Sequence, residues 1–302
     1  MRTLDPGAVS HLAGFRAGDG SPRLVAASDD TVSIWDPVAG ERTAIFDARS
    51  GVNDIVVCRP NGRDPVLALA SEMGLEWFDA VTGTPCYGST TDDTVWGLAV
   101  GTGRGEAETV FGAGYGGPHP IHRWDASTGT MNRDLGKHDD HIVSVAVFML
   151  PDGTELVAAS GWSRTIHRWD PATDLPYGRP FGGPEGIVHA MDTVLLPDGR
   201  LLLASADSAG HICRWDAVSG EPIGSPIEAH PLAVTVLAVR TQGNPQLLTS
   251  GDDEVIRRWD AITGEPLAEV AEGSDPLLLT IDGTLTMAVG GSRGLALHPF
   301  HL

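Results

Sequence analysis

The stretch KHDDH at residues 137–141 contains residue types that bind metals or perform acid–base chemistry. It places His138 and His141 three positions apart around Asp139 and Asp140. Imidazole and carboxylate groups in such a combination suit zinc and similar ions. All four side chains, however, lie on one short segment. Whether they form a site depends on where that segment lies in the fold.

Two further motifs match catalytic or nucleotide-binding patterns but lie in the wrong context. GAGYGG (112–117) satisfies the pattern G-x-G-x-x-G, yet it leads into the apolar run IHRWD and not into a helix that could meet a pyrophosphate. GGSRG (290–294) satisfies G-x-S-x-G, yet it lies between two short strand-like runs and not at a strand-to-helix elbow. Both are expected to be glycine-rich turns, and no catalytic residue is predicted from them.

The elements that must position these residues come from an internal repeat. Six segments share an aromatic–aspartate pair followed by a turn. They are SIWDPVAGE (33–41), EWFDAVTGT (76–84), HRWDASTGT (122–130), HRWDPATDL (167–175), CRWDAVSGE (213–221) and RRWDAITGE (257–265). The aspartates recur at intervals of 43 to 46 residues. Repeats of this period indicate a chain built from similar supersecondary units.

Each unit is predicted to contain four strands, a to d. An inner strand a, such as IVSVAVFML (142–150), is followed by strand b, such as LVAAS (24–28), and by strand c with the aspartate. A D-x-x-x-G turn then leads to the outer strand d, because the aspartate caps the turn and glycine adopts the positive φ that closes it. In the fourth copy Thr173 and Asp174 stand in place of the usual Ser/Thr-Gly pair, so this turn is expected to be less regular.

The repeat resembles the WD-repeat β-propeller family over essentially the whole chain. Five copies have tryptophan before the aspartate, and in the second copy Phe78 substitutes for it beside Trp77. The five tryptophans are Trp35, Trp124, Trp169, Trp215 and Trp259. Nearly all basic residues are arginine, with Lys137 the single lysine, and we interpret this skew as a sign of a bacterial, stand-alone member.

The resemblance implies an all-β fold: a seven-bladed β-propeller of four-stranded antiparallel blades, in one domain over residues 1–302. A seventh, weaker copy consists of LLLTIDG (277–283), TLTMAVGG (284–291) and GLALHPF (294–300), without a final strand d. The segment from Met1 to Leu4 has no other assignment. We therefore expect this N-terminal strand to complete the last blade, close the ring and remove an open sheet edge.

In the family, the tryptophan can join a hydrogen-bond chain through a b-strand Ser/Thr, an aspartate in the b–c turn and a histidine in the d–a loop. Asp29 and Asp253 match the turn position, and His138 and His230 match the loop position. No single copy is expected to contain all four groups clearly. The KHDDH segment is then a d–a loop in which His138 has a structural role, so a solvated loop without metal or cofactor is expected there.

Four copies have an arginine immediately before the tryptophan: Arg123, Arg168, Arg214 and Arg258. A ring of guanidinium groups could bind anions. Strand c, however, packs between blades in this family. We therefore expect each arginine to place its apolar stem against the neighbouring sheet and to pair its head with a carboxylate.

The charge and the termini limit the classes of partner and the location. A formal charge of −20 disfavours phosphate backbones and anionic membranes, so neither nucleic acid nor a membrane is predicted as a partner. No apolar run is long enough to span a membrane, and the N-terminus lacks a signal pattern. Three cysteines cannot form a disulfide framework. A cytoplasmic location is expected.

Three features coincide at the end of the fold that contains the b–c and d–a loops, the top in this family. All four Asp-Asp pairs map there, as do Trp96 and Trp162, the two tryptophans outside the repeat motif. One position near the start of strand a is also unusually variable. It reads Ser10, Asn53, Trp96, Val143, His189, Thr235 and Leu278. Acidic loops are often only solvated, and variability can be drift, so both interpretations of this end stay open.

The residues expected at a binding surface are Asn53, Asp92, Asp93, Trp96, Asp139, Asp140, His141, Trp162, His189 and Asp252. We predict a non-enzymatic scaffold, a monomer by itself, that presents this acidic and aromatic top face to another protein or peptide with a basic patch. The alternative is a small-molecule binder or enzyme at the channel mouth, with His189 or His141 as acid–base groups and Trp96 as a platform. A structural subunit of a larger assembly is the third possibility.

Overall fold

The computed structural model describes most of the chain and divides it into two compact units. The described residues are 2–5, 7–60, 63–88, 93–102, 108–114, 120–138, 140–239 and 243–301. Unit 1 comprises Met1–Gly116, His122–Asp134 and Asp275–His301. Unit 2 comprises Gly117–Ile121, Leu135–Ser274 and Leu302. The assignment of a single domain to 1–302 stays a prediction.

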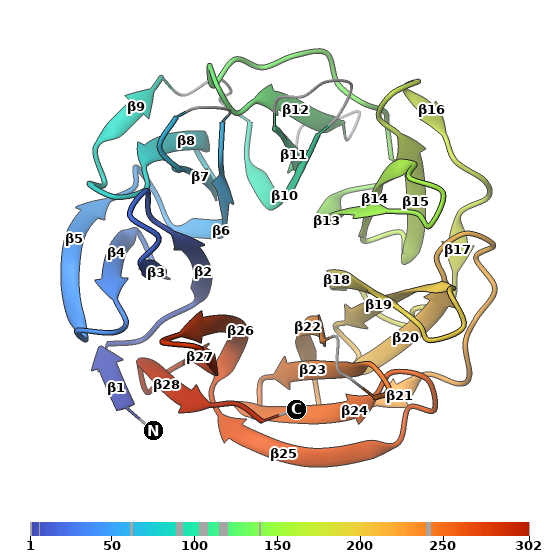
Figure 1. Cartoon of the computed structure of the whole chain (residues 1–302). Coiled ribbons are helices and arrows are strands. Elements are labelled where there is room, and N and C mark those ends of the chain that lie inside the picture. Colours follow the sequence, from blue (N-terminus) through green and yellow to red (C-terminus); the bar gives the residue numbers. More distant parts are fainter. Residues whose placement is uncertain are drawn as a thin grey trace. The chain divides into compact units, whose positions relative to one another are not determined.

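Unit 1 contains blades 1, 2, 3 and 7, numbered in chain order (Figure 1). Blade 1 consists of β2 (His11–Arg16), β3 (Pro22–Ser28), β4 (Thr31–Asp36) and β5 (Glu41–Asp47). Blade 2 consists of β6 (Val52–Cys58), β7 (Val66–Ser71), β8 (Gly74–Asp79) and β9 (Pro85–Tyr87). Blade 3 consists of β10 (Val95–Gly101), β11 (Thr109–Gly114) and β12 (Ile121–Asp125). Blade 7 consists of β26 (Ser274–Ile281), β27 (Thr284–Gly290), β28 (Leu295–Pro299) and β1 (Arg2–Asp5).

Unit 2 contains blades 4, 5 and 6. Blade 4 consists of β13 (Ile142–Met149), β14 (Glu155–Gly161), β15 (Thr165–Asp170), β16 (Leu175–Pro176) and β17 (Phe181–Gly182). Blade 5 consists of β18 (Val188–Leu195), β19 (Leu201–Asp207), β20 (His211–Asp216) and β21 (Ile227–Glu228). Blade 6 consists of β22 (Ala233–Val239), β23 (Gln246–Gly251), β24 (Val255–Asp260) and β25 (Pro266–Glu272).

The outer strands are the least regular part of the blades. In blade 3 the outer position is filled by an irregular segment, in which Asn132 N–H donates to the Arg123 carbonyl and Leu135 N–H to the Ile121 carbonyl. In blade 4 the outer strand is split into β16 and β17, which both pair with β15. The seven antiparallel sheets confirm the predicted fold class, a seven-bladed β-propeller. No helix occurs among the described residues. That part of the chain therefore contains no helix long and apolar enough to cross a membrane.

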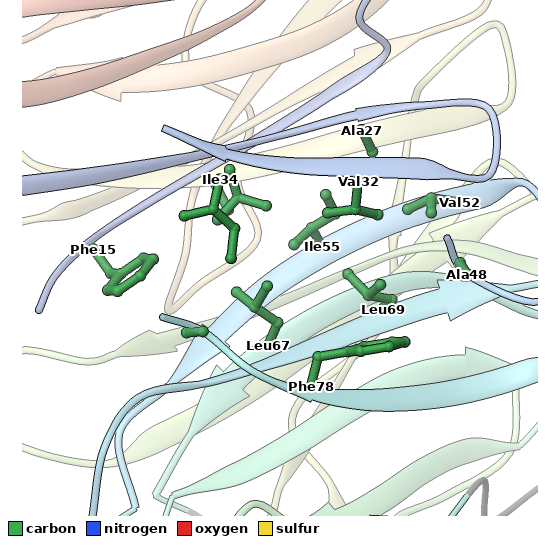
Figure 2. Packing of buried hydrophobic residues seen from close by; sticks show 13 residues of the cluster. Phe15, Ala27, Val32, Ile34, Ala48, Val52, Ile55, Leu67, Leu69 and Phe78 are labelled. Atoms are coloured by element: carbon green, nitrogen blue, oxygen red, sulfur yellow. The ribbon is translucent and has the colours of Figure 1, made fainter. Parts of the chain in front are cut away.

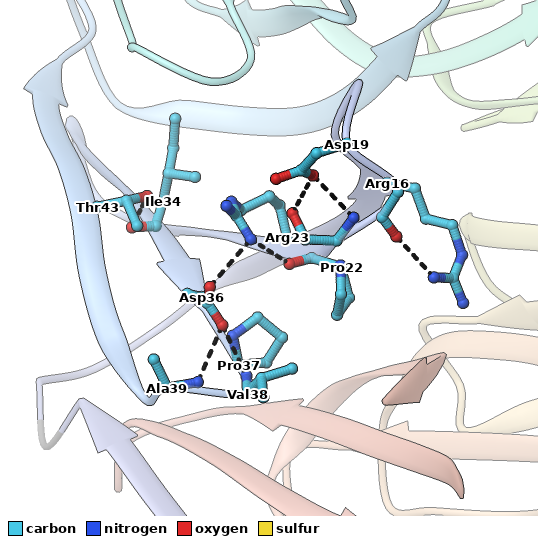
Figure 3. A network of polar contacts seen from close by, with 12 residues as sticks. Arg16, Asp19, Pro22, Arg23, Ile34, Asp36, Pro37, Val38, Ala39 and Thr43 are labelled. Carbon is cyan, nitrogen blue, oxygen red and sulfur yellow. Dashed lines mark hydrogen bonds and ion pairs between the residues drawn. The ribbon is translucent and has the colours of Figure 1, made fainter. Parts of the chain in front are cut away.

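The aspartate of each repeat caps the turn between strands c and d, as the sequence predicts. In blade 1, Asp36 Oδ1 accepts hydrogen bonds from the N–H groups of Val38 and Ala39 at 2.9 and 3.0 Å (Figure 3). The carboxylates of Asp79, Asp125, Asp170, Asp216 and Asp260 accept equivalent bonds from their own turns. These bonds satisfy N–H groups that the strands leave unpaired.

The fourth turn is as regular as the others, so the predicted irregularity is wrong. Asp174 adopts a left-handed φ of 60°, and its N–H donates to the Asp170 carbonyl at 2.9 Å. In blade 5, Gly220 N–H makes the same bond to the Asp216 carbonyl at 2.9 Å. Aspartate tolerates this conformation better than most residues, because its short polar side chain can bond locally.

The turn glycines also allow close contact between consecutive blades. A side chain of the preceding blade lies directly over each, so an added Cβ atom would overlap it. The covering pairs within the two units are Arg2 on Gly40, Phe46 on Gly83, Tyr87 on Gly129, Phe181 on Gly220 and Arg214 on Gly264. The glycine of the motif thus has a packing role in addition to its conformational one.

Apolar side chains fill the space between neighbouring blades. In unit 1, Val32 and Ile34 of blade 1 pack with Leu67 and Phe78 of blade 2 (Figure 2). Phe78 pairs with Leu67, as Trp35 pairs with Leu24 in blade 1, which confirms that Phe78 replaces the tryptophan of the repeat.

The N-terminal strand completes blade 7, as predicted. β1 pairs with β28 in antiparallel register, with Arg2 opposite Leu297 and Thr3 opposite Ala296 (Figure 1). Arg2 also reaches blade 1, where its guanidinium donates to the carbonyls of Val38 and Ala39 at 3.0 and 2.5 Å. The strand therefore covers the edge of β28 and ties it to the next blade.

Candidate functional site

The b–c turns and d–a loops lie at the same end of the blades, here called the loop end. In unit 1, Val52 N–H donates to the Asp29 carbonyl at 2.8 Å, and Thr94 Oγ1 donates to the Glu72 carbonyl at 3.2 Å. Each bond joins a d–a segment to a b–c turn.

In unit 2, three bonds also join these two kinds of segment, with the b–c turn as the donor. Trp162 N–H donates to the His141 carbonyl, Ser208 N–H to that of Ile187 and Asp252 N–H to that of Leu232. The loop end of each unit is therefore a surface of hydrogen-bonded loops on a rigid sheet scaffold, where binding residues commonly lie.

The variable position near the start of strand a is a β-bulge in most blades. The pairing register between strands a and b shifts at Val52/Asp54, Val95/Leu98, Ile142/Ser144, Val188/Ala190 and Ala233/Thr235. Asn53, Trp96, Val143 and His189 are the residues within these shifts. A bulged residue is released from strand pairing, and its side chain can be aimed at a ligand.

Three members of the predicted column lie outside these register shifts. Thr235 pairs directly with Ser250, so in blade 6 the residue within the register shift is Val234. Leu278 lies inside β26, four residues after the strand begins at Ser274. Ser10 precedes β2 and is not part of a strand. A bulge adds one residue to its strand. Equivalent positions that are assigned by counting along the sequence can therefore be wrong by one residue.

In unit 1 the bulge of β10 exposes Trp96. Its side chain is 36% exposed, although Val95 before it and Leu98 after it are buried. Asn53 in the preceding blade donates from Nδ2 to the Val95 carbonyl at 2.9 Å. Asn53 is therefore a support for the bulge. Asp93 is exposed immediately before it.

In unit 2 the b–c turn of blade 4 exposes Trp162. Its indole is 53% exposed and meets the His141 imidazole edge-on, with 5.4 Å between ring centroids. Asp140 precedes His141, and its carboxylate accepts the His141 N–H at 2.7 Å. An exposed indole therefore packs against a half-buried imidazole beside a carboxylate.

His189 and Asp252 form the second part of the loop end in unit 2. Both side chains are exposed. Desolvation by the neighbouring loops lowers the pKa of His189, whereas the negative charges of Asp207 and Asp252 act in the opposite direction. His189 is therefore mainly uncharged near pH 7, and the surface around it has a net negative charge.

The described residues of the KHDDH segment have different surroundings. His138 is buried, with Nδ1 3.1 Å from the Asp140 carbonyl oxygen and Nε2 3.3 Å from that of Thr165. His141 instead contacts Trp162. Asp139 and, in the other unit, Asp92 lie outside the described residues. Within the described residues, no group of three His, Cys, Asp or Glu side chains is arranged to hold a metal ion.

Blade 6 contains the full hydrogen-bond chain, so the expectation that no copy would do so is wrong. Trp259 Nε1 donates to Thr249 Oγ1 at 2.9 Å, and His230 Nε2 lies 2.8 Å from the same oxygen. His230 Nδ1 lies 2.9 Å from Asp253 Oδ1, and Arg257 binds the other carboxylate oxygen of Asp253 at 2.5 Å.

Two of the four arginines before the tryptophans, Arg168 and Arg214, are confirmed as structural, but they donate to backbone carbonyls and not to the predicted carboxylates. Arg168 donates to the carbonyls of Ala217 and Val218 in the next blade at 2.6 and 3.0 Å. Arg214 makes the equivalent bonds to blade 6. The Arg168 guanidinium also lies 4.0 Å from the centre of the Phe181 ring, and desolvation lowers its pKa to about 10. The acceptors are carbonyls of the c–d turn in the next blade, which the aspartate cap holds close together.

The cysteines do not add reactive groups to the site. All three are free thiols. Burial raises the pKa of Cys58 and raises that of Cys213 to about 12, so both thiols are protonated at neutral pH. A thiol must be ionised to act as a nucleophile.

Sequence reasoning missed two sets of functional side chains. Thr249 of the hydrogen-bond chain is a polar residue in the apolar run QLLTS, which was the available signal. Asp54 and Asp275 lie on inner strands and accept hydrogen bonds from the next blade. The signal for these was a carboxylate within the runs VNDIVVC and SDPLLLTI.

Comparison with known families and structures agrees with this architecture. The model of the family described as WD domain, G-beta repeat matches residues 129–170. That segment runs from the turn glycine of blade 3 to the aspartate of blade 4, which is slightly less than one repeat period. No curated protein matches the sequence. The family match and the seven blades together support a WD-repeat β-propeller.

Two solved structures share the fold at low sequence identity. The structure of U3-55K superposes with a TM-score of 0.75 at 15% identity, covering 99% of this chain and 98% of that one. The computationally designed Ika8 protein superposes with a TM-score of 0.66 at 16% identity, covering 99% of this chain and all of the other. At such identity the similarity shows the fold alone.

Proposed function

We propose that this WD-repeat β-propeller is a non-enzymatic scaffold that binds another protein or a peptide through its loop-end residues. The observation that carries the proposal is the exposure of Trp162, a large aromatic side chain in a tight turn, outside the packing position of the repeat. Trp96 has the same character in unit 1. Exposed aromatic side chains on rigid scaffolds become binding anchors when a partner covers them.

The charge at the loop end suits a partner with a basic patch. Asp93 contributes a carboxylate at the loop end of unit 1, Asp140 and Asp252 contribute carboxylates at that of unit 2, and the chain has a formal charge of −20. Such a surface speeds the encounter with a cationic partner and selects against anionic ones. Arginine and lysine side chains also interact favourably with the face of an indole ring.

The proposal is tested by affinity capture from the organism that makes the protein, followed by binding kinetics with the purified partner. Trp162→Ala is expected to speed dissociation by about 30-fold, which corresponds to about 2 kcal/mol for a buried anchor. The matched control is Leu175→Ala, which removes a 63% exposed side chain on the outer strand β16. Equal effects of the two variants, or no effect of either, would refute the proposal.

Charge and aromatic contacts are expected to act on different rate constants. Asp140→Lys and Asp252→Lys should slow association and weaken its dependence on salt, because surface charges act mainly on the encounter. They should change dissociation little. If both substitutions leave the association rate and its salt dependence unchanged, the acidic loops have no role in partner binding.

A further inference from the structure

Two inner strands of unit 1 reach the next blade through a carboxylate. Asp54 on β6 accepts a hydrogen bond through Oδ2 from Leu98 N–H on β10 at 2.7 Å. Asp275 on β26 accepts one through Oδ2 from Leu12 N–H on β2 at 2.5 Å. An inner strand is the edge of its blade, so some of its N–H groups have no partner within the sheet. The carboxylates supply that partner across the boundary between two blades.

Asp54 acts together with its neighbour Asn53 on one short segment. Asn53 donates to the Val95 carbonyl at 2.9 Å, and Asp54 accepts from Leu98 N–H. Val95 and Leu98 are the residues between which the register of β10 shifts. The two side chains therefore hold both ends of the bulge that exposes Trp96.

We propose that Asn53 and Asp54 form a proton-controlled clamp on the β10 bulge, which sets how Trp96 is presented to a partner. Asn53 is the constant part of this clamp, because its amide does not ionise near neutral pH. Asp54 is the variable part. Its ionised form attracts the Leu98 N–H more strongly, whereas its protonated form is the one that burial favours. The significance of Trp96 rests on the proposed function, but the clamp itself does not.

The surroundings of Asp54 place its titration near neutral pH. Burial raises its pKa to about 6, against the opposing effect of hydrogen bonds from Leu98 and Ile55. Burial likewise raises the pKa of Asp275 to about 7, and the negative charge of Asp54 adds to this shift. The negative charge of Asp54 therefore makes Asp275 harder to ionise.

The strands packed against Asp54 do not supply a compensating positive charge close to it. β7 and β10 have no ionisable side chain. β2 has His11 at one end and the exposed Arg16 at the other. Burial lowers the pKa of His11, which disfavours its cationic form. The ratio of ionised to protonated Asp54 then changes about a hundredfold between pH 5 and pH 7.

The clamp is tested by nuclear magnetic resonance of the full-length protein between pH 5 and pH 8. The backbone amide of Leu98 and the indole N–H of Trp96 are expected to titrate together, with a midpoint near pH 6. In Asp54→Asn this midpoint should disappear from both signals. Asp192→Asn in unit 2 is the matched control. That carboxylate accepts from Ala238 N–H at 2.8 Å in the same manner, and its removal should leave both unit 1 signals unchanged.

A second variant separates the clamp from a general loss of folding. Asp275→Asn keeps Asp54 and its bond to Leu98 N–H, so the shared midpoint of Leu98 and Trp96 should persist near pH 6. Signals that do not change with pH in the wild type, or that titrate equally in Asp54→Asn, would overturn the proposal. A Trp96→Ala variant that binds the partner normally would refute the binding role of Trp96 and leave the titration intact.

Discussion

Blades 6 and 3 contain the same Arg-Trp-Asp sequence but secure their tryptophans in different ways. Trp259 in blade 6 donates to Thr249, which also contacts His230. Trp124 in blade 3 is completely buried, and its indole N–H has no hydrogen-bond partner among the described residues. The same motif is thus fixed by a polar network in one blade and by packing alone in the other.

The difference originates on strand b and not in the motif. Gly112 stands on β11 where Thr249 stands on β23. Without a side chain at 112, the Trp124 ring lies directly over the backbone, and an added Cβ would overlap it. Compared with blade 6, blade 3 has closer packing of its tryptophan on strand b but no hydroxyl group there to accept the indole N–H. The energetic contribution of a repeated motif therefore depends on residues that do not repeat.

Removing the hydroxyl at the centre of the blade 6 network is expected to have the largest effect. Thr249→Val should lower the free energy of unfolding by about 2–3 kcal/mol, because it leaves the Trp259 and His230 nitrogens without their buried partner. Chemical denaturation measures this. Thr235→Val in the same blade is the control, since its hydroxyl contacts Ser250 Oγ in a partly exposed position and should cost less than about 1 kcal/mol.

Blade 4 should respond to an intermediate degree. His138 is buried between the Asp140 and Thr165 carbonyls and 4.4 Å from the centre of the His167 ring. His138→Ala is expected to cost about 1–2 kcal/mol, because one buried hydrogen bond and these ring contacts are lost. An unfolding curve identical to the wild type would show that the loop histidine does not stabilise the blade.

A matched pair of tryptophan substitutions isolates the hydrogen bond itself. Trp259→Phe and Trp124→Phe remove similar ring area, but only the first removes a hydrogen bond between described residues. Trp259→Phe should therefore cost about 1 kcal/mol more than Trp124→Phe in the free energy of unfolding. Equal costs would mean that the network in blade 6 adds nothing beyond packing.

The smallest effect is expected in the pH dependence of blade 6. Burial lowers the pKa of His230 below its unfolded value, although Asp253 acts in the opposite direction. The unfolded chain then binds more protons at this residue below about pH 6.5, so this contribution to stability falls as pH decreases. Other titrating groups also contribute to the pH dependence of stability. The measurement is therefore the difference between wild type and His230→Gln at pH 7.5 and pH 5.5, which should shrink on acidification.

The sequence predicted the blades well because the interactions that form them join residues close to one another in the chain. The spacing of the aromatic–aspartate pairs, the turn caps and the replacement by Phe78 all depend on neighbouring residues. The split outer strand of blade 4 was not predicted. Its segment LPYGRPF (175–181) has two prolines and a glycine with positive φ at Gly178, next to the Arg168 guanidinium. That contact depends on the arginine of strand c, which periodicity alone does not reveal.

The exposure of two tryptophans was predicted from the sequence, but the local structure that holds them was not. Trp96 and Trp162 were singled out because the repeat did not explain them, and both are exposed. The bulge that contains Trp96 adds a residue to the strand. The alternation of side chains between the two faces of a strand, read along the sequence, does not show where such a residue is inserted. What Asp54 contacts depends on the inner strand of the next blade, so it follows only from the folded structure.

The most direct test of the binding account is amide hydrogen exchange of the protein with and without its captured partner. We expect slower exchange at 93–98 in unit 1 and at 140–143 and 161–165 in unit 2, because these loop-end segments contain the exposed tryptophans and their supports. The a–b turns at 150–154 and 196–200 should exchange at unchanged rates. Protection confined to those turns or to the outer strands would contradict the account and place the partner elsewhere on the blades.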